Sequence, residues 1–238
     1  MCGRYSFFDT DKLYERFDIT KGKQKLNDRY NVAPGQLMPV ITQHIERNSL
    51  ATMQWGLIPG WTRDIKDALH LINARSETLN QKPSFREPLK KQRCLVPANG
   101  FFEWKKEING KIPYYIRPKS GQTIALAGLY DKWLNPANNE NIYTYTIITT
   151  SASKGLSSIH ARMPAIIPLG LESDWLNTAE QDPTTLQQII KSPSSETMEY
   201  FPVSTLVNKP EHDSPEILEP ISQEKNKTHR NITKNNVK

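Results

Sequence analysis

The stretch YTYTIITT, residues 143–150, indicates the fold of this chain more clearly than any other segment. Tyrosine alternates with threonine and then gives way to a β-branched run, a pattern typical of a buried strand that ends near Thr150. Comparable patterns recur elsewhere and predict strands at Leu37–Thr42, Leu50–Trp55, Arg93–Trp104, Pro113–Arg117 and Thr123–Tyr130. The chain is therefore rich in strands.

Short helical segments complete the pattern. We predict helices over Asp11–Phe17, where Thr10 can cap the first turn, over Pro83–Gln92 and over Pro183–Lys191. The strands follow one another without a regular strand–helix alternation, which argues against a doubly wound parallel sheet. We expect an α+β fold: a single domain with a mostly antiparallel, barrel-like β core and short peripheral helices.

Composition limits the class of protein. A chain of 238 residues suits one large domain, and 37% hydrophobic and 24% charged residues are typical of a folded soluble protein. No apolar run approaches the roughly 18 residues of a membrane span, and no signal peptide opens the chain. Two cysteines are too few for a disulfide framework or a cysteine zinc site, so we expect a cytoplasmic protein that does not contact membranes.

The net charge indicates the kind of binding partner, and the composition of the C-terminal part indicates where the domain ends. The formal net charge of +6 and the pI near 9.2 favour anionic partners such as nucleic acid, although part of that charge lies near the C-terminus. From Asn208 onward the sequence is polar and interrupted by prolines. We therefore predict a domain over residues 1–207 and a polar tail over residues 208–238, disordered beyond about Pro220.

Cys2 is the first candidate for chemistry. Removal of Met1 would leave a terminal cysteine whose amine and thiol are both partly nucleophilic near neutral pH. An aldehyde that meets such a 1,2-aminothiol forms an imine and then closes to a five-membered thiazolidine ring. Position 2 is an unremarkable residue in many proteins, so this interpretation needs partner groups elsewhere in the chain.

Four polar segments interrupt apolar surroundings and could supply those partners: residues 2–4, 72–77, 99–104 and 159–164. Each feature has an ordinary structural explanation, since amides bond loop backbones, carboxylates and guanidinium groups are often solvated, and histidines are often satisfied structural residues. Together with Cys2, however, they provide a nucleophile, an amide, a carboxyl group, an imidazole and anion-binding forks. The candidates are Arg4, Asn73, Arg75, Glu103, His160 and Arg162.

Several blocks in order along the chain resemble the SOS response-associated peptidase (SRAP) family. The resemblance runs from residue 1 to about Val207 and departs at none of the candidate positions. It is carried by MCGRY (1–5), YNVAP (30–34), WGLIP (55–59), NARSET (73–78), RCLVPANGFFEW (93–104) and IHARMP (159–164).

The resemblance implies an SRAP fold and a role in the DNA damage (SOS) response. Its expected partner is single-stranded DNA containing abasic sites, which Cys2 would capture as a covalent thiazolidine cross-link. Asn73 would orient the linkage, Glu103 would assist proton transfers, and His160 would act as general acid and base. The DNA-binding residues implied by the same resemblance are Arg4, Arg75 and Arg162 for phosphates, and Pro34, Trp61 and Trp104 for the bent strand.

The chemistry itself agrees with these roles and leaves alternatives open. Imine formation needs proton transfers that an acid–base pair can supply, and aromatic stacking tolerates any base. An imine at the sugar also permits β-elimination, so weak lyase activity is expected, and Met1 removal could be autocatalytic. We expect no metal or cofactor, a monomer, and recruitment to the nucleoid. The alternatives are a thiol peptidase that acts on peptides and a non-covalent single-stranded DNA-binding module.

Overall fold

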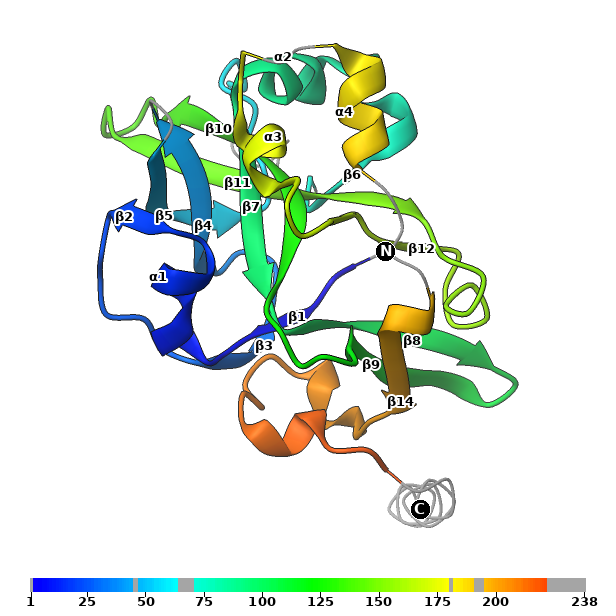
Figure 1. Cartoon of the computed structure of the whole chain (residues 1–238). Coiled ribbons are helices and arrows are strands. Elements are labelled where there is room, and N and C mark those ends of the chain that lie inside the picture. The colour runs from blue at the N-terminus through cyan, green and yellow to red at the C-terminus, as the bar shows by residue number, and fades with distance from the viewer. Residues whose placement is uncertain (1, 45–46, 64–70, 180–181, 191–194, 222–238) are drawn as a thin grey trace.

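Five strands form a closed barrel at the centre of the molecule (Figure 1). Neighbours in the order β5–β4–β7–β10–β11 pair antiparallel, and a parallel pairing of β11 with β5 closes the ring. The computed structural model describes residues 2–44, 47–63, 71–179, 182–190 and 195–221. The barrel strands are β4 (Leu37–His44), β5 (Arg47–Trp55), β7 (Arg93–Ala98), β10 (Ile124–Leu134) and β11 (Asn141–Ser151).

Burial explains why these segments form strands. Strand β11 buries six consecutive residues, Thr144–Thr149, because one face lines the barrel interior and the other is covered. Gly128 in β10 is required by close packing, since a Cβ there would lie 2.7 Å from the Cys94 Sγ. Cys94 is therefore a buried residue of β7, and the predicted strand at residues 143–150 is confirmed.

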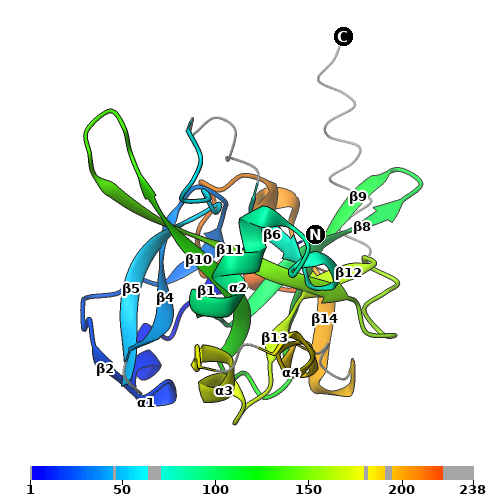
Figure 2. The same ribbon diagram turned by 90° about the horizontal axis from the view of Figure 1, so that it is seen from above.

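A second, antiparallel sheet packs beside the barrel. Its order is β14 (Met198–Pro202), β9 (Gly110–Pro118), β8 (Gly100–Glu107), β1 (Tyr5–Phe7) and β3 (Arg29–Val32). Figure 2 shows the β8–β9 and β10–β11 hairpins extending outward on opposite sides of the molecule. The predicted α+β fold with a mostly antiparallel, barrel-like core is thus confirmed.

The predicted single strand Arg93–Trp104 is wrong in one respect, because the chain leaves the barrel in its middle. Strand β7 belongs to the barrel and β8 to the second sheet, and Asn99 alone separates them. The Asn99 side chain accepts a hydrogen bond from the Phe8 amide at 2.7 Å, which fixes this crossing. The next residue is the glycine Gly100, because a Cβ at this position would lie 2.6 Å from the phenol of Tyr115.

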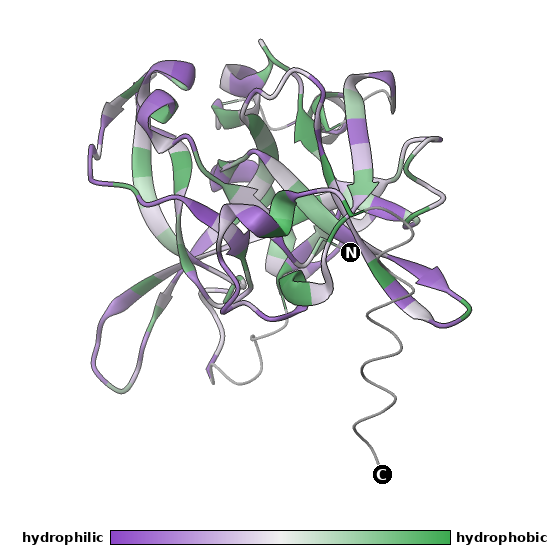
Figure 3. Ribbon diagram, turned by 90° about the horizontal axis from the view of Figure 1, so that it is seen from below, coloured by the Kyte–Doolittle hydropathy of each residue, from purple (hydrophilic) through white to green (hydrophobic). Residues whose placement is uncertain are grey.

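Short strands extend the barrel sheet. Strand β6 (Asn73–Arg75) pairs parallel with β11, β2 (Ile19–Lys21) pairs parallel with β5, β12 (Arg162–Pro164) pairs antiparallel with β11, and β13 (Ile166–Ile167) pairs antiparallel with β10. Sequence patterning missed these segments, since two or three residues carry no period. Hydrophobic residues concentrate on the central strands, whereas the outlying loops are mostly hydrophilic (Figure 3).

Helices are short, as predicted, and α2, α3 and α4 lie at one end of the barrel (Figure 1). The predicted cap at Thr10 is wrong: Thr10 lies inside a 3-10 turn that follows Asp9, whose φ is 55°. The predicted helix end at Lys191 lies outside the described residues. The helices are η1 (Thr10–Lys12), α1 (Leu13–Arg16), η3 (Ser76–Thr78), α2 (Pro83–Lys91), α3 (Glu172–Leu176), α4 (Pro183–Ile189), η4 (Ser195–Thr197), η5 (Thr205–Asn208) and η6 (Pro215–Leu218). No helix in the described part of the chain is long and apolar enough to span a bilayer.

A buried arginine ties two of these helices to the barrel. Arg93, at the start of β7, is only 1% exposed. Its guanidinium donates to the carbonyls of Leu89 and Trp175, both at 2.6 Å, and to that of Asn177. These carbonyls lie at or near the C-terminal ends of α2 and α3, where free acceptors and the helix dipole favour a cation. Arg93 thus has a structural role that its charge alone does not suggest.

The folded unit continues past the predicted boundary at residue 207. We call residues 203–221 the C-terminal strap. It includes η5 and η6, and Val203 forms an antiparallel bridge with Pro220. Val203, Val207 and Ile217 are buried against the second sheet. Residues 208–221 are therefore packed on the domain, where the buried Ile217 and several polar contacts hold them. Residues 222–238 lie outside the described part of the chain.

A candidate active site around Cys2

Cys2 lies where the barrel meets the second sheet, just before β1. It is completely buried, and its thiol contacts the Arg4 carbonyl at 3.8 Å. Burial raises the pKa of the Cys2 thiol far above its ordinary value, and the negative charge of Glu103 adds to that shift. The thiol is therefore protonated at neutral pH.

Asn73 holds the backbone of Cys2. Its Nδ2 donates a hydrogen bond to the Cys2 carbonyl oxygen at 2.8 Å. The position of Asn73 comes from β6, whose parallel pairing sets Asn73 opposite Ile147 of β11. Because β6 is extended, Asn73 and Arg75 lie on the same face, with Ala74 buried between them. The amide of Asn73 and the guanidinium of Arg75 thus share one face of β6.

Glu103 and His160 form a second contact near the cysteine. Glu103 is 3% exposed on β8, and its Oε1 lies 3.8 Å from the His160 Nδ1. Burial raises the pKa of Glu103, while a positive charge on His160 would oppose that shift. The ring of His160 is oriented by the backbone N–H of Arg162, 3.0 Å from Nδ1. A buried carboxyl group with a raised pKa beside an imidazole is suited to proton transfer.

The four predicted catalytic residues therefore come together from separate elements. Cys2 precedes β1, Asn73 lies on β6, Glu103 on β8, and His160 immediately before β12. No group of three or more histidine, cysteine, aspartate or glutamate side chains in the described residues could hold a metal ion.

The three predicted phosphate-binding arginines differ in what they already contact. Arg75 is exposed on β6. Arg162 donates to Glu77 at 2.5 Å and to the Thr149 carbonyl at 2.5 Å, so its guanidinium faces acceptors of the protein. The hydrogen bond from Arg162 lowers the pKa of Glu77, which keeps that carboxylate ionised.

Arg4 is bound more extensively than its predicted role suggested. Its Nη1 donates to the Asn31 Oδ1 at 2.9 Å and to the Val207 carbonyl at 2.7 Å, and its Nη2 donates to the Asn208 carbonyl at 3.2 Å. An arginine carries five N–H donors, so these three bonds leave two for another ligand. Arg4 therefore joins the N-terminal strand to the C-terminal strap.

The residues predicted to support or wedge the nucleic acid differ in how far they are exposed. Trp61 is 67% exposed, and Pro34 is exposed in the turn after β3. Trp104 is half-buried, and its Nε1–H donates to the Asn208 Oδ1 at 2.8 Å. Trp61 and Trp104 thus both present ring surface, but only Trp104 is held by a hydrogen bond to the strap.

Sequence reasoning missed the residues that support this site. Glu77 and Asn31 lie inside the quoted blocks, yet nothing in their spacing indicated that they bind Arg162 and Arg4. Asn208 and Asp213 were assigned to the polar tail. Their contacts span more than 100 residues of sequence, so local patterns cannot predict them.

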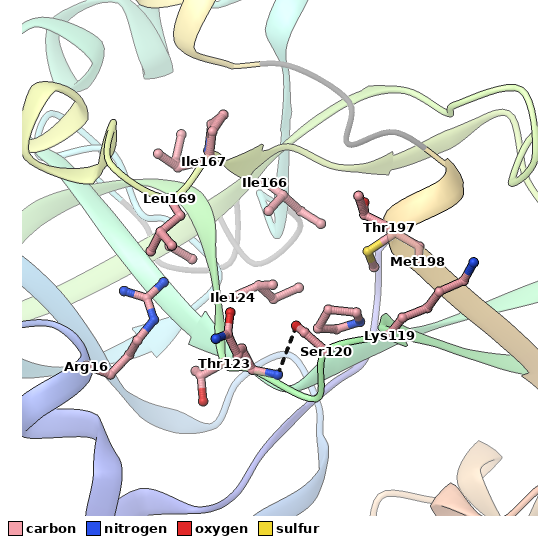
Figure 4. A pocket seen from close by; sticks show the side chains of 14 residues that line it. Arg16, Lys119, Ser120, Thr123, Ile124, Ile166, Ile167, Leu169, Thr197 and Met198 are labelled. Atoms are coloured by element: carbon pink, nitrogen blue, oxygen red, sulfur yellow. Dashed lines mark hydrogen bonds between the residues drawn. The ribbon is translucent and has the colours of Figure 1, made fainter.

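A separate cavity of about 690 Å³ opens between the start of β10, β13 and the end of β9 (Figure 4). Its walls are mostly apolar, including Ile124, Ile166 and Met198. Among the residues that the structure describes, the lining includes none of the predicted site residues and no cysteine, histidine or carboxylate. Arg16 at its rim is already paired with Glu172. The catalytic residues predicted from the sequence therefore lie outside this cavity, around Cys2.

Comparison with known proteins agrees with the geometry. The family model described as SOS response associated peptidase (SRAP) matches residues 1–210. The abasic site processing protein YoqW of Bacillus subtilis is 43% identical over 223 residues, which cover 92% of this chain and 99% of that protein. The abasic site processing protein HMCES of Gallus gallus is 36% identical over 224 residues, covering 81% of this chain and 66% of that protein.

Solved structures show the same fold. A crystal structure of a protein from Bacteroides thetaiotaomicron superposes with a TM-score of 0.84 at 32% identity, covering 93% of this chain and all of that one. A protein from Bordetella bronchiseptica superposes with a TM-score of 0.74 at 25% identity, covering 85% of this chain and all of that one.

Proposed function

Because this chain belongs to the SOS response-associated peptidase (SRAP) family, we propose that it binds abasic sites in single-stranded DNA and links to them covalently through Cys2. The observation that carries the proposal is the convergence of Asn73, Glu103 and His160 around the buried Cys2. The names of the relatives, which describe abasic site processing, supply the substrate class.

The proposed reaction starts after Met1 has been removed, which turns the nitrogen of Cys2 from an amide into a free amine. That amine attacks C1′ of the ring-opened abasic sugar, and the resulting carbinolamine loses water to give an imine. The thiol sulfur then adds to the imine carbon, and the thiol proton passes to nitrogen. Aldehyde and aminothiol together yield one thiazolidine and one water.

The raised pKa values of the site favour this order of steps. A thiol whose pKa is raised by burial stays protonated while the amine attacks first. Glu103 retains its proton to a higher pH than an exposed carboxyl group would, because burial raises its pKa. It can therefore donate a proton to the departing hydroxyl group, and His160 beside it can open the sugar ring and later reverse the linkage.

The surrounding cations and rings suit a bent single strand. Arg4, Arg75 and Arg162 would contact phosphates next to the lesion, with a phosphate replacing Glu77 at Arg162. Trp61 and Trp104 would stack on neighbouring bases, and Pro34 would support the backbone. Stacking on ring faces demands no sequence, as the capture of a lesion in any context requires.

Two side activities extend the proposal. The imine intermediate permits β-elimination, so weak cleavage at the abasic site is expected as a lyase activity. Glu103 and His160 would also assist the removal of Met1, an autopeptidase activity. A monomer located in the cytoplasm and recruited to the nucleoid remains the prediction from sequence.

A denaturing gel tests the proposal. The protein is incubated with single-stranded DNA carrying one abasic site, and a slower band that survives denaturation is the expected product. Cys2→Ala should abolish that band, whereas the matched variant Cys94→Ser, at the other cysteine, should retain it. An undamaged oligonucleotide should give no band.

A native gel and a peptide hydrolysis assay on the same variants separate the alternatives. A passive single-stranded DNA-binding module would bind in native gels, yield no denaturation-resistant band, and tolerate Cys2→Ala. A thiol peptidase would hydrolyse a supplied peptide without DNA and lose that activity in Cys2→Ala. The first pattern would contradict covalent capture, and the second without a denaturation-resistant band would assign Cys2 to peptide hydrolysis instead.

A further inference from the structure

The C-terminal strap contacts two side chains of the proposed DNA-binding surface. The Asn208 Oδ1 accepts a hydrogen bond from the indole N–H of Trp104 at 2.8 Å. The neighbouring carbonyls of Val207 and Asn208 accept bonds from the Arg4 guanidinium at 2.7 and 3.2 Å. One short segment thus holds both an aromatic ring and a cation.

Asn31 on β3 fixes that segment in place. Its Nδ2 donates to the carbonyls of Val207, Lys209 and His212 at 3.2, 3.0 and 2.8 Å. Its Oδ1 accepts from Arg4 at 2.9 Å. Asn31 is fully buried, so its amide cannot exchange these partners for water without opening the strap.

Asp213 provides the reciprocal anchor from the strap to β3. Its Oδ1 accepts from the backbone amides of Tyr30 and Asn31 at 2.6 and 2.7 Å, and its Oδ2 pairs with Arg29. Ile217 adds a buried apolar contact beside Phe102, the residue before Glu103. The position of Asn208 therefore follows from contacts on both sides of it.

The hydrogen bond to Trp104 also limits how that ring can bind DNA. The indole N–H is the only hydrogen-bond donor of a tryptophan side chain, and Asn208 already accepts from it. The ring is thus left to interact through its π-face, which stacks on any base. A ring held in one orientation loses less conformational freedom when a base stacks on it.

We propose that Asn208 is a positioning residue for DNA binding: it orients the Trp104 ring for base stacking, while the strap around it holds Arg4 toward the phosphates. This inference rests on the proposed function and deepens it. It concerns the non-covalent encounter with single-stranded DNA, not the reaction at Cys2.

The test is a double-mutant cycle between Asn208→Ala and Trp104→Phe, with Thr205→Ala as matched control. Thr205 is an exposed residue of the same strap, so its loss changes neither charge nor these contacts. Affinity for undamaged single-stranded DNA is measured by fluorescence anisotropy. Cross-linking rate is measured separately at saturating abasic DNA. Thermal melting checks that every variant is folded.

Asn208→Ala should weaken DNA binding by about fivefold, the size expected for one hydrogen bond, with an unchanged cross-linking rate at saturation. In the Trp104→Phe background it should have no further effect, because phenylalanine has no N–H to orient. Thr205→Ala should match the unmodified chain. Wild-type affinity in Asn208→Ala, an effect that persists with Trp104→Phe, or a slower saturated reaction would overturn the inference.

The outcomes also separate this inference from the proposed function. If the unmodified chain binds undamaged DNA but forms no cross-link, covalent capture fails, while the affinity cycle still decides the role of Asn208. If the cross-link forms and the cycle shows additive effects, only the positioning role fails. A chain that does not bind single-stranded DNA at all would refute both.

Discussion

Asp213→Ala should destabilise the whole domain, although sequence analysis placed this residue in a polar tail. The carboxylate accepts hydrogen bonds from the backbone amides of Tyr30 and Asn31 at 2.6 and 2.7 Å and pairs with Arg29. Alanine would leave both amides of β3 without their acceptor. It would also release the strap end from the second sheet, because Asp213 is the side chain among the described residues that accepts from both amides.

The expected loss follows from these contacts. A hydrogen bond to a charged group contributes about 1.5–3 kcal/mol when buried, and the Asp213 side chain is 21% exposed, so the lower end applies to each amide. The Arg29 pair is partly exposed and adds about 0–1 kcal/mol. Together these give a loss of about 3 kcal/mol in the free energy of unfolding.

Urea unfolding measures this loss. With a slope of about 3 kcal/mol per molar urea, the midpoint should fall by about 1 M for Asp213→Ala. Asp213→Asn keeps an oxygen acceptor but loses the charge, so it should lose roughly half as much. A midpoint for Asp213→Ala within about 0.2 M of the unmodified chain would refute the reasoning, since water would then satisfy the two amides as well as the carboxylate does.

Three further predictions concern the site and its support. Gly100→Ala places a Cβ 2.6 Å from the Tyr115 phenol and should lower stability by about 1–3 kcal/mol; an unchanged melting temperature would show that the phenol moves freely. Glu77→Gln removes the carboxylate that competes for Arg162 and should tighten DNA binding about two- to fivefold in a salt titration, whereas weaker binding would mean that Glu77 positions that arginine. Glu103→Gln should raise the melting temperature at about pH 8 and have less effect toward about pH 4. Because burial raises the folded-state pKa of Glu103, the stability of the unmodified chain is complete at low pH and is lost as the pH rises through that pKa. A stabilisation by Glu103→Gln that grows on acidification would contradict the burial effect.

Much of the fold could be predicted because the long strands carry clear local patterns. The barrel strands β4, β5, β10 and β11 lie close to their predicted ranges, and the helices at Leu13–Arg16 and Pro83–Lys91 lie within theirs. The closure of the barrel could not be predicted, because the parallel pairing of β11 with β5 depends on tertiary geometry rather than on either sequence.

The side chains of the candidate site could be proposed from the sequence, but the contacts that support them could not. The residue types and the family resemblance pointed to the groups around Cys2, whereas the placement of Asn73 beside Cys2 depends on β6, a strand too short to show a period. The strap was missed because its composition is polar: its attachment relies on Asn31 and Asp213, whose partners are backbone groups far away in the sequence. Arg93 was missed for the same reason, since its acceptors are helix-end carbonyls.

The one-residue crossing at Asn99 has a consequence for how such proteins can diversify. Because the register of β8 is set at its Asn99 end, Glu103 keeps its place whatever happens at the far turn near Gly110. The β8–β9 hairpin can therefore become longer or shorter, or change the sequence of its turn, without moving the Glu103 carboxyl group. New contacts could arise there while the candidate site around Cys2 keeps its geometry.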